Sequence, residues 1–568
     1  MPFTAPVSEF QFLLGHVVGF PELAKTDRFA DATTDTVDAI LTEAGRLSDQ
    51  VMAPLQRNGD LTPAVLENGA VRTSPGFADG YKAIAEGGWV GISADPEFGG
   101  MGLPLTLATA VNDMMSAACL SLQLNPLLSQ GQIEALEKHG DDAMKALYLP
   151  KLTSGVWTGT MNLTEPQAGT DVGALKTRAV DNGDGTFAIT GQKIFISWAD
   201  HDMADNVCHM VLARLPDAPA GTKGISLFMV PKLLPNDDGS LGQDNGIRVV
   251  SLEHKMGLHG SPTAVLEFDG ATGWMVGAPN TGMAAMFTMM NNARLGVGVQ
   301  GIGAAEGAYQ HALSYALERQ QGRTPTGKPA IADHADVRRM LLGMKADIFA
   351  ARSIALSCAV AIDMAQAGQG DDWAARAALL TPIAKAFGTD VGIEVSSTGV
   401  QVHGGMGFIE ETGATQYSRD VRVTAIYEGT NGIQAMDLVG RKLSDGGEAA
   451  ERLIHEVQDD VEKARTALPD LARAVWEAAE NLREATEWML TCSDMNDRFA
   501  GAVPYLRAFA RVLGAHFHLK AALAADAKGP RLAVARFYIE RLLPEHTGLL
   551  AHAGVGAKGL YAIDLEDL

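Results

Sequence analysis

Three short polar segments interrupt otherwise apolar stretches of this 568-residue chain, and each holds residue types that can bind a small molecule. Residues 163–171 combine hydroxyls with a Pro/Gly turn, whose N–H groups can hydrogen-bond the edge of a planar heteroaromatic ring. Residues 401–408 contain paired glycines, which permit close backbone approach to a phosphate or a ring. Residues 426–432 place the carboxylate of Glu428 between an aromatic residue and a glycine. Taken singly, each segment has an ordinary explanation: a capped loop, a helix break and a solvated surface glutamate.

A fourth segment, Gly296 to Gly301, matches the dinucleotide-binding pattern G-x-G-x-x-G and has Glu318 further along the chain. That pattern requires a preceding strand, whereas residues 282–294 are rich in Met and Ala and are predicted to be helical. We therefore expect these small residues to let two helices approach closely.

Sequence signals for metal sites and for hydrolases are missing. The 14 histidines include no H-E-x-x-H pair, no serine lies in a G-x-S-x-G motif, and Gly327-Lys328 is followed by proline instead of Ser or Thr. The four cysteines form no C-x-x-C pair, which favours neither a zinc site nor a disulfide framework (Cys119, Cys208, Cys358 and Cys492). We expect no metal site and a reducing, cytoplasmic location.

The elements that must position the polar segments follow from hydrophobic periodicity. Helical spacing of apolar residues runs from about residue 36 to 152 and again from about 281 to 442. Between them lie short β-rich segments separated by turn residues (186–197, 207–213, 224–230, 247–252 and 264–268). Ser444 to Gly447 predict a hinge, after which one apolar helix face resumes.

The expected fold class is therefore α+β with several domains: an N-terminal helical domain, a middle β-barrel-like domain, a C-terminal helical bundle and an extra C-terminal helical extension. The expected division is an N-terminal extension at 1–35, the helical domain at 36–156, the β-domain at 157–275, the bundle at 281–443 and the extension at 448–568.

Composition and charge exclude several classes of protein. With 45 Lys and Arg against 68 Asp and Glu, the formal charge is -23, which disfavours binding to nucleic acid and to anionic membranes. Hydrophobic residues make up 46% of the chain, which is ordinary for a folded protein. Charged residues interrupt the most apolar stretches, so we expect no membrane span.

Together and in this order, the three polar segments resemble the acyl-CoA dehydrogenase family. The resemblance is collinear from about residue 36 to 443, and it includes further short motifs in register (Gly191-Gln192-Lys193, Lys255-Met256-Gly257 and Leu317-Glu318-Arg319). It implies FAD as the cofactor and an acyl-CoA thioester as the substrate, which is dehydrogenated to a trans-2-enoyl-CoA. Glu428 is then the base that removes the α-proton, while hydride passes from Cβ to flavin N5.

The resemblance also implies which residues contact the cofactor and the substrate. The implied FAD contacts are Met161, Leu163, Thr164, Thr170, Phe195, Ile196, Ser197, Arg319, Gln321, Gln401, Gly404, Gly405 and Thr430, of which Arg319 and Gln401 to Gly405 reach the FAD of a neighbouring subunit. The implied substrate contacts are Thr170, Asn291, Arg294, Tyr427 and Gly429.

Two positions depart from the family pattern. Arg319-Gln320-Gln321-Gly322 keeps the glutamine of the usual R-x-Q-F-G motif but lacks its phenylalanine. Asn291 stands where the family often has Asp, and Arg294 follows it by three residues, so we expect both to face the pocket.

The chain resembles the long bacterial branch of the family in its length, in the Ala5-Pro6-Val7 segment, in the stretch from Asp336 to Leu341 and in the added C-terminal helices. This likeness implies a short or medium acyl-CoA, with 3-methylmercaptopropionyl-CoA of dimethylsulfoniopropionate breakdown as the candidate. It also implies a homodimer, since the added helices cover the face that shorter relatives use to form tetramers, and an electron-transfer flavoprotein as acceptor. The alternatives are an acyl-CoA oxidase that uses oxygen and a family-like binding protein without redox function.

Overall fold

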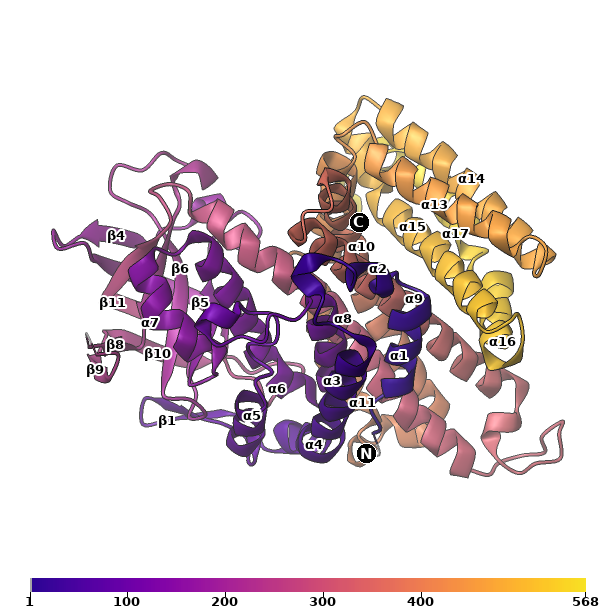
Figure 1. The fold of residues 1–568 in the computed structure, drawn as a ribbon, viewed down its shortest axis with the longest axis horizontal. Coiled ribbons are helices and arrows are strands. Elements are labelled where there is room, and N and C mark those ends of the chain that lie inside the picture. Colours follow the sequence, from indigo (N-terminus) through magenta and orange to yellow (C-terminus); the bar gives the residue numbers. More distant parts are fainter. Residues whose placement is uncertain (1–2, 237) are drawn as a thin grey trace. The chain divides into compact units, whose positions relative to one another are not determined.

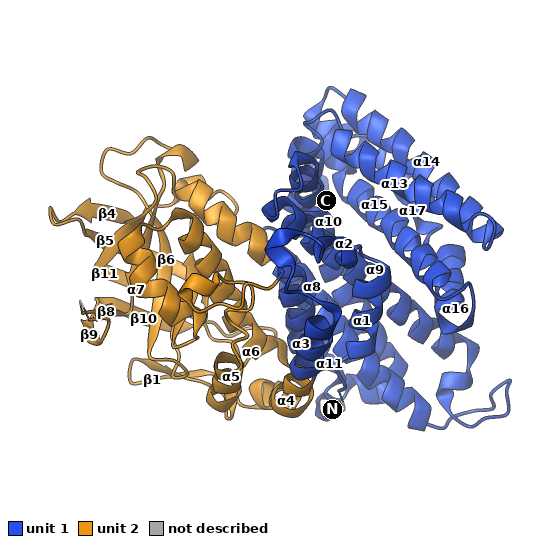
Figure 2. Ribbon diagram, viewed as in Figure 1, with its two compact units in different colours: residues 1–45, 104–117, 294–568 blue, residues 46–103, 118–293 orange. Residues whose placement is uncertain are grey.

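The structure, a computed structural model, describes residues 3–236 and 238–568. The chain forms two compact units, each assembled from segments that are distant in sequence (Figure 1, Figure 2). Unit 1 comprises residues 1–45, 104–117 and 294–568, and unit 2 comprises residues 46–103 and 118–293. Two long helices, α6 (Leu105–His139) and α8 (Gly282–Glu318), contribute to both units.

Unit 2 is built around a seven-stranded sheet with the order β3-β6-β7-β11-β5-β4, in which β10 also pairs with β11. Only β3 and β6 run parallel; the other described pairs are antiparallel. One apolar cluster fills the sheet interior, including Phe228, Val230 and Phe268. The elements of this unit are α4 (Ala53–Leu61), α5 (Phe77–Glu86), α7 (Asp142–Thr153), β1 (Val65–Glu67), β2 (Ala70–Arg72), β3 (Trp157–Asn162), β4 (Arg178–Asp181), β5 (Phe187–Ser197), β6 (Asn206–Ala213), β7 (Ser226–Pro231), β8 (Leu233–Pro235), β9 (Leu241–Asp244), β10 (Ile247–Leu252) and β11 (Thr263–Val276).

Unit 1 is helical, and its core lies where α9, α10 and α15 pack together. The elements wholly or mainly within it are α1 (Val7–His16), α2 (Phe20–Leu23), α3 (Thr34–Leu47), α9 (Ala335–Gln366), α10 (Asp371–His403), α11 (Ala414–Val421), α12 (Asn431–Asp437), α13 (Glu448–Ala464), α14 (Pro469–Thr491), α15 (Met495–Ala524), α16 (Gly529–Phe537) and α17 (Glu545–Ala553). The expected hinge lies between α12 and α13, where Gly446 and Gly447 both have positive φ. The expected fold class is confirmed. The five-segment division of the chain stays a prediction, because compactness groups its segments into two units.

Helices α8 and α10 touch backbone to backbone, as the small residues of the G-x-G-x-x-G segment predict. A Cβ at Gly298 would lie 2.7 Å from the carbonyl oxygen of Ala384, and one at Gly301 would lie 2.5 Å from that of Gly388. A Cβ at Gly392 would in turn lie 2.7 Å from the carbonyl oxygen of Gly301. These glycines therefore serve helix packing.

A buried ion cluster joins three helices inside unit 1. Arg352 of α9 donates to both carboxylate oxygens of Asp113 on α6, at 2.8 and 3.0 Å, and to Glu306 on α8 at 3.1 Å. The side chains of Arg352 and Asp113 are each 3% exposed and that of Glu306 is 9% exposed. Each charge thus has a partner that offsets the cost of removing it from water.

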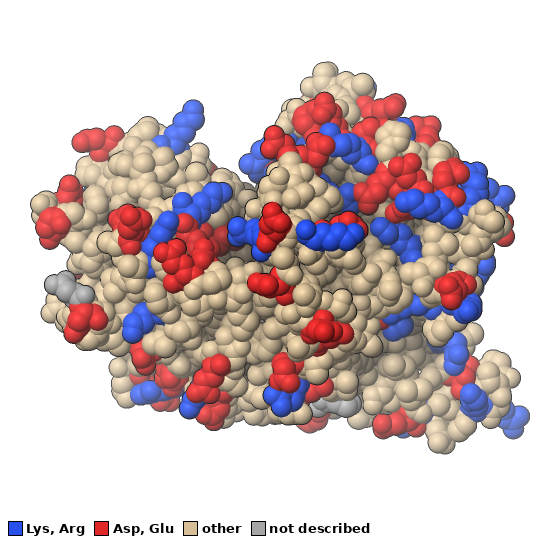
Figure 3. All heavy atoms as spheres, in the orientation of Figure 1, with Lys and Arg blue, Asp and Glu red and all other residues tan. Residues whose placement is uncertain are grey.

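Two helices, α6 and α9, are long and apolar enough to cross a membrane by length and composition alone. However, 94% and 89% of their most apolar windows are buried within the structure, so they are core helices. On the face shown in Figure 3, acidic side chains are interspersed with basic ones over the C-terminal helices.

Candidate active site

Glu428 lies in a tight left-handed turn between a short 3-10 helix, η9 (Arg422–Ala425), and α12. Its φ is 55° and that of Gly429 is 85°. A positive φ is uncommon for a residue with a Cβ, costs of order 1–3 kcal/mol, and persists only where the surroundings impose it. The φ of Gly429 lies in the region that favours glycine, and a Cβ there would also lie 2.9 Å from Nε2 of Gln434, which would have to shift. Such imposed strain is typical of a functional site.

Two side chains hold this turn through its carbonyl groups. Nε2 of Gln434 donates to the carbonyl oxygens of Glu428 and Gly429, at 3.1 and 3.3 Å. Nζ of Lys385, on α10, donates to the Gly429 carbonyl at 3.0 Å and to Oδ1 of Asn431 at 2.9 Å. The turn is thereby fixed from both the adjoining helix and the crossing of α8 and α10.

The surroundings of Glu428 favour a carboxyl group that can gain and lose a proton near neutral pH. Burial raises its pKa to about 7, although the nearby cations Arg294 and Lys385 act to lower it. Arg294 is buried and forms an ion pair with Asp437 at 3.3 Å. A base whose pKa lies near the working pH is the most effective in proton transfer.

The backbone of the same turn offers unpaired donors. Within residues 3–236 and 238–568, the N–H groups of Glu428 and Gly429 donate no hydrogen bond, whereas the N–H of Tyr427 is bonded to the carbonyl of Val423 at 3.1 Å. Unpaired N–H groups beside a carboxylate can stabilise negative charge that develops on a carbonyl oxygen.

Two other glutamates have environments that are unsuited to a base. Burial alone would raise the pKa of Glu165, but Lys193 at 2.9 Å and hydrogen bonds from Thr177 and from the Lys176 N–H lower it to about 2. Glu410 is exposed and forms an ion pair with Arg419 at 3.0 Å.

Glu165 instead organises the loop at residues 163–171 in unit 2. Its partner Lys193 lies on β5, is fully buried, and also donates to the carbonyl of Leu163 at 3.1 Å. The N–H of Ile194 donates to the carbonyl of Thr164 at 2.9 Å. The first polar segment is therefore fastened along strand β5.

A β-bulge in the same strand turns an aromatic side chain outward. The register between β5 and β11 shifts between the pairs Lys193–Leu266 and Ile196–Ala264, so β5 carries one extra residue. Phe195 lies in this bulge with φ of 60°, and 60% of its surface is exposed. An exposed aromatic ring on a strained strand, beside a loop of hydroxyl groups, is suited to a planar ligand.

The domains of known protein families that match this chain show its family. The acyl-CoA dehydrogenase N-terminal domain matches residues 35–156, the middle domain residues 160–271 and the C-terminal domain residues 280–443. An acetyl-CoA dehydrogenase C-terminal-like domain matches residues 453–564. The chain belongs to the acyl-CoA dehydrogenase family. It is an FAD-dependent oxidoreductase that acts on CH–CH bonds of acyl-CoA thioesters.

Several relatives match most of the length of this acyl-CoA dehydrogenase. The 3-methylmercaptopropionyl-CoA dehydrogenase of Ruegeria pomeroyi is 44% identical over 519 residues, 89% of this chain and 88% of the relative. A butyryl-CoA dehydrogenase of Syntrophomonas wolfei is 32% identical over 556 residues, 90% of each chain. The structure of Caenorhabditis elegans ACDH-11 in complex with C11-CoA has a TM-score of 0.79, covers 95% of this chain and 94% of its own, and is 21% identical, which shows the fold alone.

The FAD contacts expected in unit 2 of this acyl-CoA dehydrogenase differ in how exposed they are. Thr170 and Phe195 are exposed, while Leu163, Thr164 and Ser197 are half-buried. Met161 and Ile196 have buried side chains, and Ile196 belongs to the apolar cluster of the sheet, so its backbone alone is available to a ligand. The exposed ring and the neighbouring hydroxyls fit a flavin.

The FAD contacts expected in unit 1 are open to solvent. Arg319, Gln321, Gln401, Gly404, Gly405 and Thr430 are all exposed. A Cβ at Gly404 or Gly405 would meet no atom within 4 Å, and within the described residues the guanidinium of Arg319 has no ion-pair partner. Thr430 caps α12 by accepting from the N–H of Ile433. This open surface with a free guanidinium suits a pyrophosphate.

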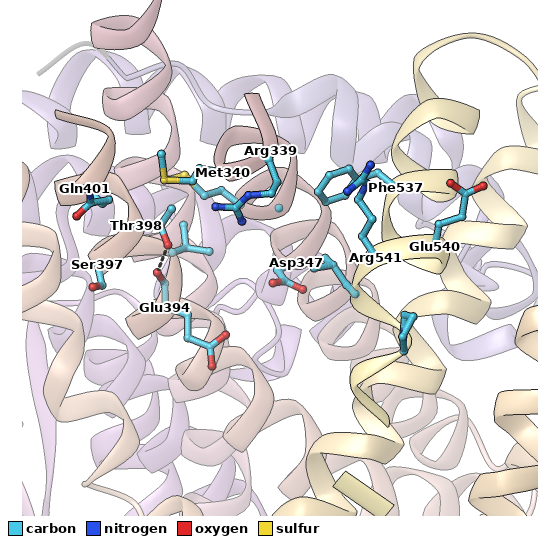
Figure 4. A pocket seen from close by; sticks show the side chains of 15 residues that line it. Arg339, Met340, Asp347, Glu394, Ser397, Thr398, Gln401, Phe537, Glu540 and Arg541 are labelled. Atoms are coloured by element: carbon cyan, nitrogen blue, oxygen red, sulfur yellow. Dashed lines mark hydrogen bonds between the residues drawn. The ribbon is translucent and has the colours of Figure 1, made fainter. Parts of the chain in front are cut away.

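Gln401 also lines a pocket of about 790 Å³ between α9, α10 and the C-terminal extension (Figure 4). Arg339 and Met340 contribute from α9, and Phe537 and Arg541 contribute from the extension. The extension thus forms one wall of a cavity that reaches an expected FAD contact.

The substrate contacts expected by resemblance differ in exposure. Asn291 is exposed, whereas Arg294, three residues later on α8, is buried and paired with Asp437, so Arg294 acts on Glu428 through charge. The hydroxyl of Tyr427 donates to Oε1 of Gln300 on α8, which orients its ring.

Sequence reasoning missed Lys385, Gln434 and the pairing of Glu165 with Lys193. One signal for Lys385 is visible in hindsight: it is the only charged residue between Arg376 and Asp390, in an otherwise apolar or small stretch of helix. A lysine in such a stretch has to be buried with partners or displaced to the surface.

A carboxylate and histidine cluster in the extension has the proximity of metal ligands but is already neutralised. Glu456, Asp460 and His516 bring ligand atoms within 4.8 Å of one another. Asp460 pairs with Lys463 at 2.7 Å and with Lys520 at 3.3 Å, and His516 donates to it at 2.8 Å. The two lysines already neutralise the negative charge that a metal ion would need.

Proposed function

We propose that this acyl-CoA dehydrogenase removes the α-proton of a short or medium acyl-CoA with Glu428 and forms the trans-2-enoyl-CoA. The observation that carries the proposal is the turn itself. It combines a carboxyl group of raised pKa, an imposed left-handed backbone and two N–H groups that donate to no atom of the described residues.

The chemistry accounts for each of these features. The α-proton of a thioester is very weakly acidic, so a carboxylate removes it only where burial has raised the basicity of that carboxylate. The proton is transferred to a carboxylate oxygen of Glu428, while the N–H groups of the turn stabilise the charge that develops on the thioester oxygen. FAD, when bound, supplies the acceptor for the hydride that leaves Cβ.

The residues proposed to hold FAD fall into two groups. Phe195 and Ser197, with the loop from Met161 to Thr170, contact the flavin, as does Thr430. Arg319, Gln321, Gln401, Gly404 and Gly405 bind the pyrophosphate side of the FAD of a neighbouring subunit. Thr170, Asn291, Tyr427 and Gly429 are proposed to contact the thioester.

The candidate substrate is 3-methylmercaptopropionyl-CoA, which the name of the 44% identical relative supports. In anaerobic mixing, we expect it and butyryl-CoA to bleach the flavin absorbance faster than palmitoyl-CoA does, by about tenfold or more in the rate of flavin reduction. Each methylene that a pocket accepts or rejects is worth about 1–3 kcal/mol, so a few side chains suffice for this preference. Turnover confined to long-chain acyl-CoA would contradict the substrate assignment. Rapid peroxide formation in air would instead favour an oxidase over a dehydrogenase that passes electrons to an electron-transfer flavoprotein.

The proposed assembly is a cytoplasmic homodimer in which each subunit completes the FAD site of the other. Replacing Arg319 with alanine is expected to release FAD from the dimer, because a charge-assisted contact to the pyrophosphate is lost. Light scattering together with the ratio of flavin to protein absorbance measures both properties. A parent protein that is monomeric and retains FAD would contradict the shared site. Replacing Arg465, which lies at the surface of the extension and pairs with Glu462, is the control and should leave FAD bound.

A further inference from the structure

A buried lysine with no direct carboxylate partner lies under the Glu428 turn. The Lys385 side chain has no exposed surface, and among the described residues it forms no ion pair within 4 Å. Its ammonium group donates to the Gly429 carbonyl and to the side chain of Asn431. Burying an ammonium group among neutral oxygens costs free energy, so its retention calls for a compensating effect nearby.

The position of Lys385 is fixed from both sides. Its backbone lies in the helix crossing, where a Cβ at Gly298 would approach its Cα to 3.1 Å. Its acceptor Asn431 is held in turn, because Nδ2 donates to Oδ1 of Asp390 at 2.7 Å and to Oγ1 of Thr389 at 3.0 Å. The ammonium group therefore has one place to lie.

We propose that Lys385 is the positioning residue for the base: its ammonium group fixes the left-handed turn that carries Glu428 and favours the ionised form of that carboxyl group. This inference rests on the proposed role of Glu428. Lys385 itself contacts neither Cα nor the hydride, and it acts through the turn and through its charge.

The charged groups around the base set the direction of the effect. Burial raises the pKa of Glu428, and the cations Arg294, from α8, and then Lys385, from α10, lower it again. Arg294 is largely compensated by Asp437, which also pairs with Arg441. The other ionisable groups that face this region are Tyr427, in the turn, and Asp390, which follows Lys385 on α10. Lys385 is thus a cation near Glu428 without a carboxylate at contact distance, so its removal should raise the pKa of the base.

The test is the pH profile of flavin reduction by Lys385→Met, with 3-methylmercaptopropionyl-CoA or, if it reacts faster, butyryl-CoA. In the parent enzyme the rate should rise with pH through about 7, as Glu428 ionises. In Lys385→Met the rising limb should move up by about one pH unit, which is about a tenfold lower rate on the acid side. The plateau should also fall, because the turn is less well fixed. Lys520→Met, which removes a lysine from the extension, should keep the parent profile.

A second variant separates charge from folding. Lys385→Gln keeps a donor but removes the charge, so its limb should move while its plateau stays closer to that of the parent. A parent-like limb in either variant, when it is folded and retains FAD, overturns the proposal. If neither variant yields folded protein with FAD, Lys385 serves folding and the proposal is also overturned. If Glu428→Gln reduces its flavin normally, the base assignment fails first; if it is inactive while the limb of the Lys385 variants is unchanged, the inference about Lys385 alone fails.

Discussion

Replacing Glu428 with glutamine should leave a folded, yellow protein that binds acyl-CoA but reduces its flavin at least about 10⁴-fold more slowly, the upper end of what a general base usually contributes. Glutamine keeps the size of the side chain, and the carbonyl contacts of Gln434 and Lys385 that hold the turn do not involve the carboxyl group. The variant lacks only the group that accepts the proton. Anaerobic stopped-flow measurement of flavin bleaching gives the rate, and titration with acyl-CoA gives the affinity.

The matched control is Glu410→Gln, which removes an exposed ion pair and should change neither rate nor stability appreciably. Near-parent flavin reduction by Glu428→Gln would show that the base is another group.

Folding stability gives a second readout of the same variant. The raised pKa of Glu428 means that the folded protein binds this proton more tightly than the unfolded chain, so folding stability falls as pH rises from about 4.5 to about 7. Glu428→Gln should lack that decline.

Replacing Arg352 with methionine should lower the free energy of unfolding by about 3–5 kcal/mol at pH 8, the usual cost of leaving buried charges without their partner. Asp113 and Glu306 would remain inside unit 1 with no guanidinium between α6, α8 and α9. Chemical denaturation of the holoenzyme measures the loss. Arg536→Met is the control, because Arg536 pairs with Glu540 at the surface and should cost less than about 1 kcal/mol.

Arg352→Met should be destabilised less at pH 5 than at pH 8. Burial already raises the pKa of Asp113 in the parent, against the lowering effect of Arg352, and loss of the arginine raises it further. A carboxyl group with a raised folded-state pKa contributes stability at low pH that is lost as pH rises through that pKa. An equal loss at both pH values would indicate that the deficit comes from packing.

Much of the fold could be predicted because it follows local patterns. The β-rich segments at 186–197, 207–213 and 247–252 correspond to β5, β6 and β10, and the helix-approach interpretation of Gly296 to Gly301 is confirmed. Strand β4 was missed, since four mostly exposed residues carry little apolar signal. The two discontinuous units also escaped prediction, because they depend on contacts between residues far apart in sequence.

The candidate site was predictable only where chemistry and resemblance coincide. Glu428 could be named from its motif, but the support by Lys385 comes from a helix more than 40 residues away, and no local pattern encodes that contact. The role of Glu165 could not be predicted, because no local sequence pattern reveals its hydrogen bonds to Lys193 and Thr177. The side chain of Ile196, which stays a predicted FAD contact, belongs to the apolar cluster of the sheet, and the sequence does not reveal the neighbouring bulge at Phe195.

The glycine crossing of α8 and α10 has a consequence for genetics. At Gly298 and Gly301 the atoms that a methyl group would strike are backbone atoms of the other helix, including the carbonyl oxygens of Ala384 and Gly388. A clash with a side chain can be relieved by a smaller residue on the other helix. A clash with backbone atoms cannot, because every residue has them. Alanine at either position should therefore have no second-site suppressor among the residues it touches, and selection for restored activity should return mainly true revertants.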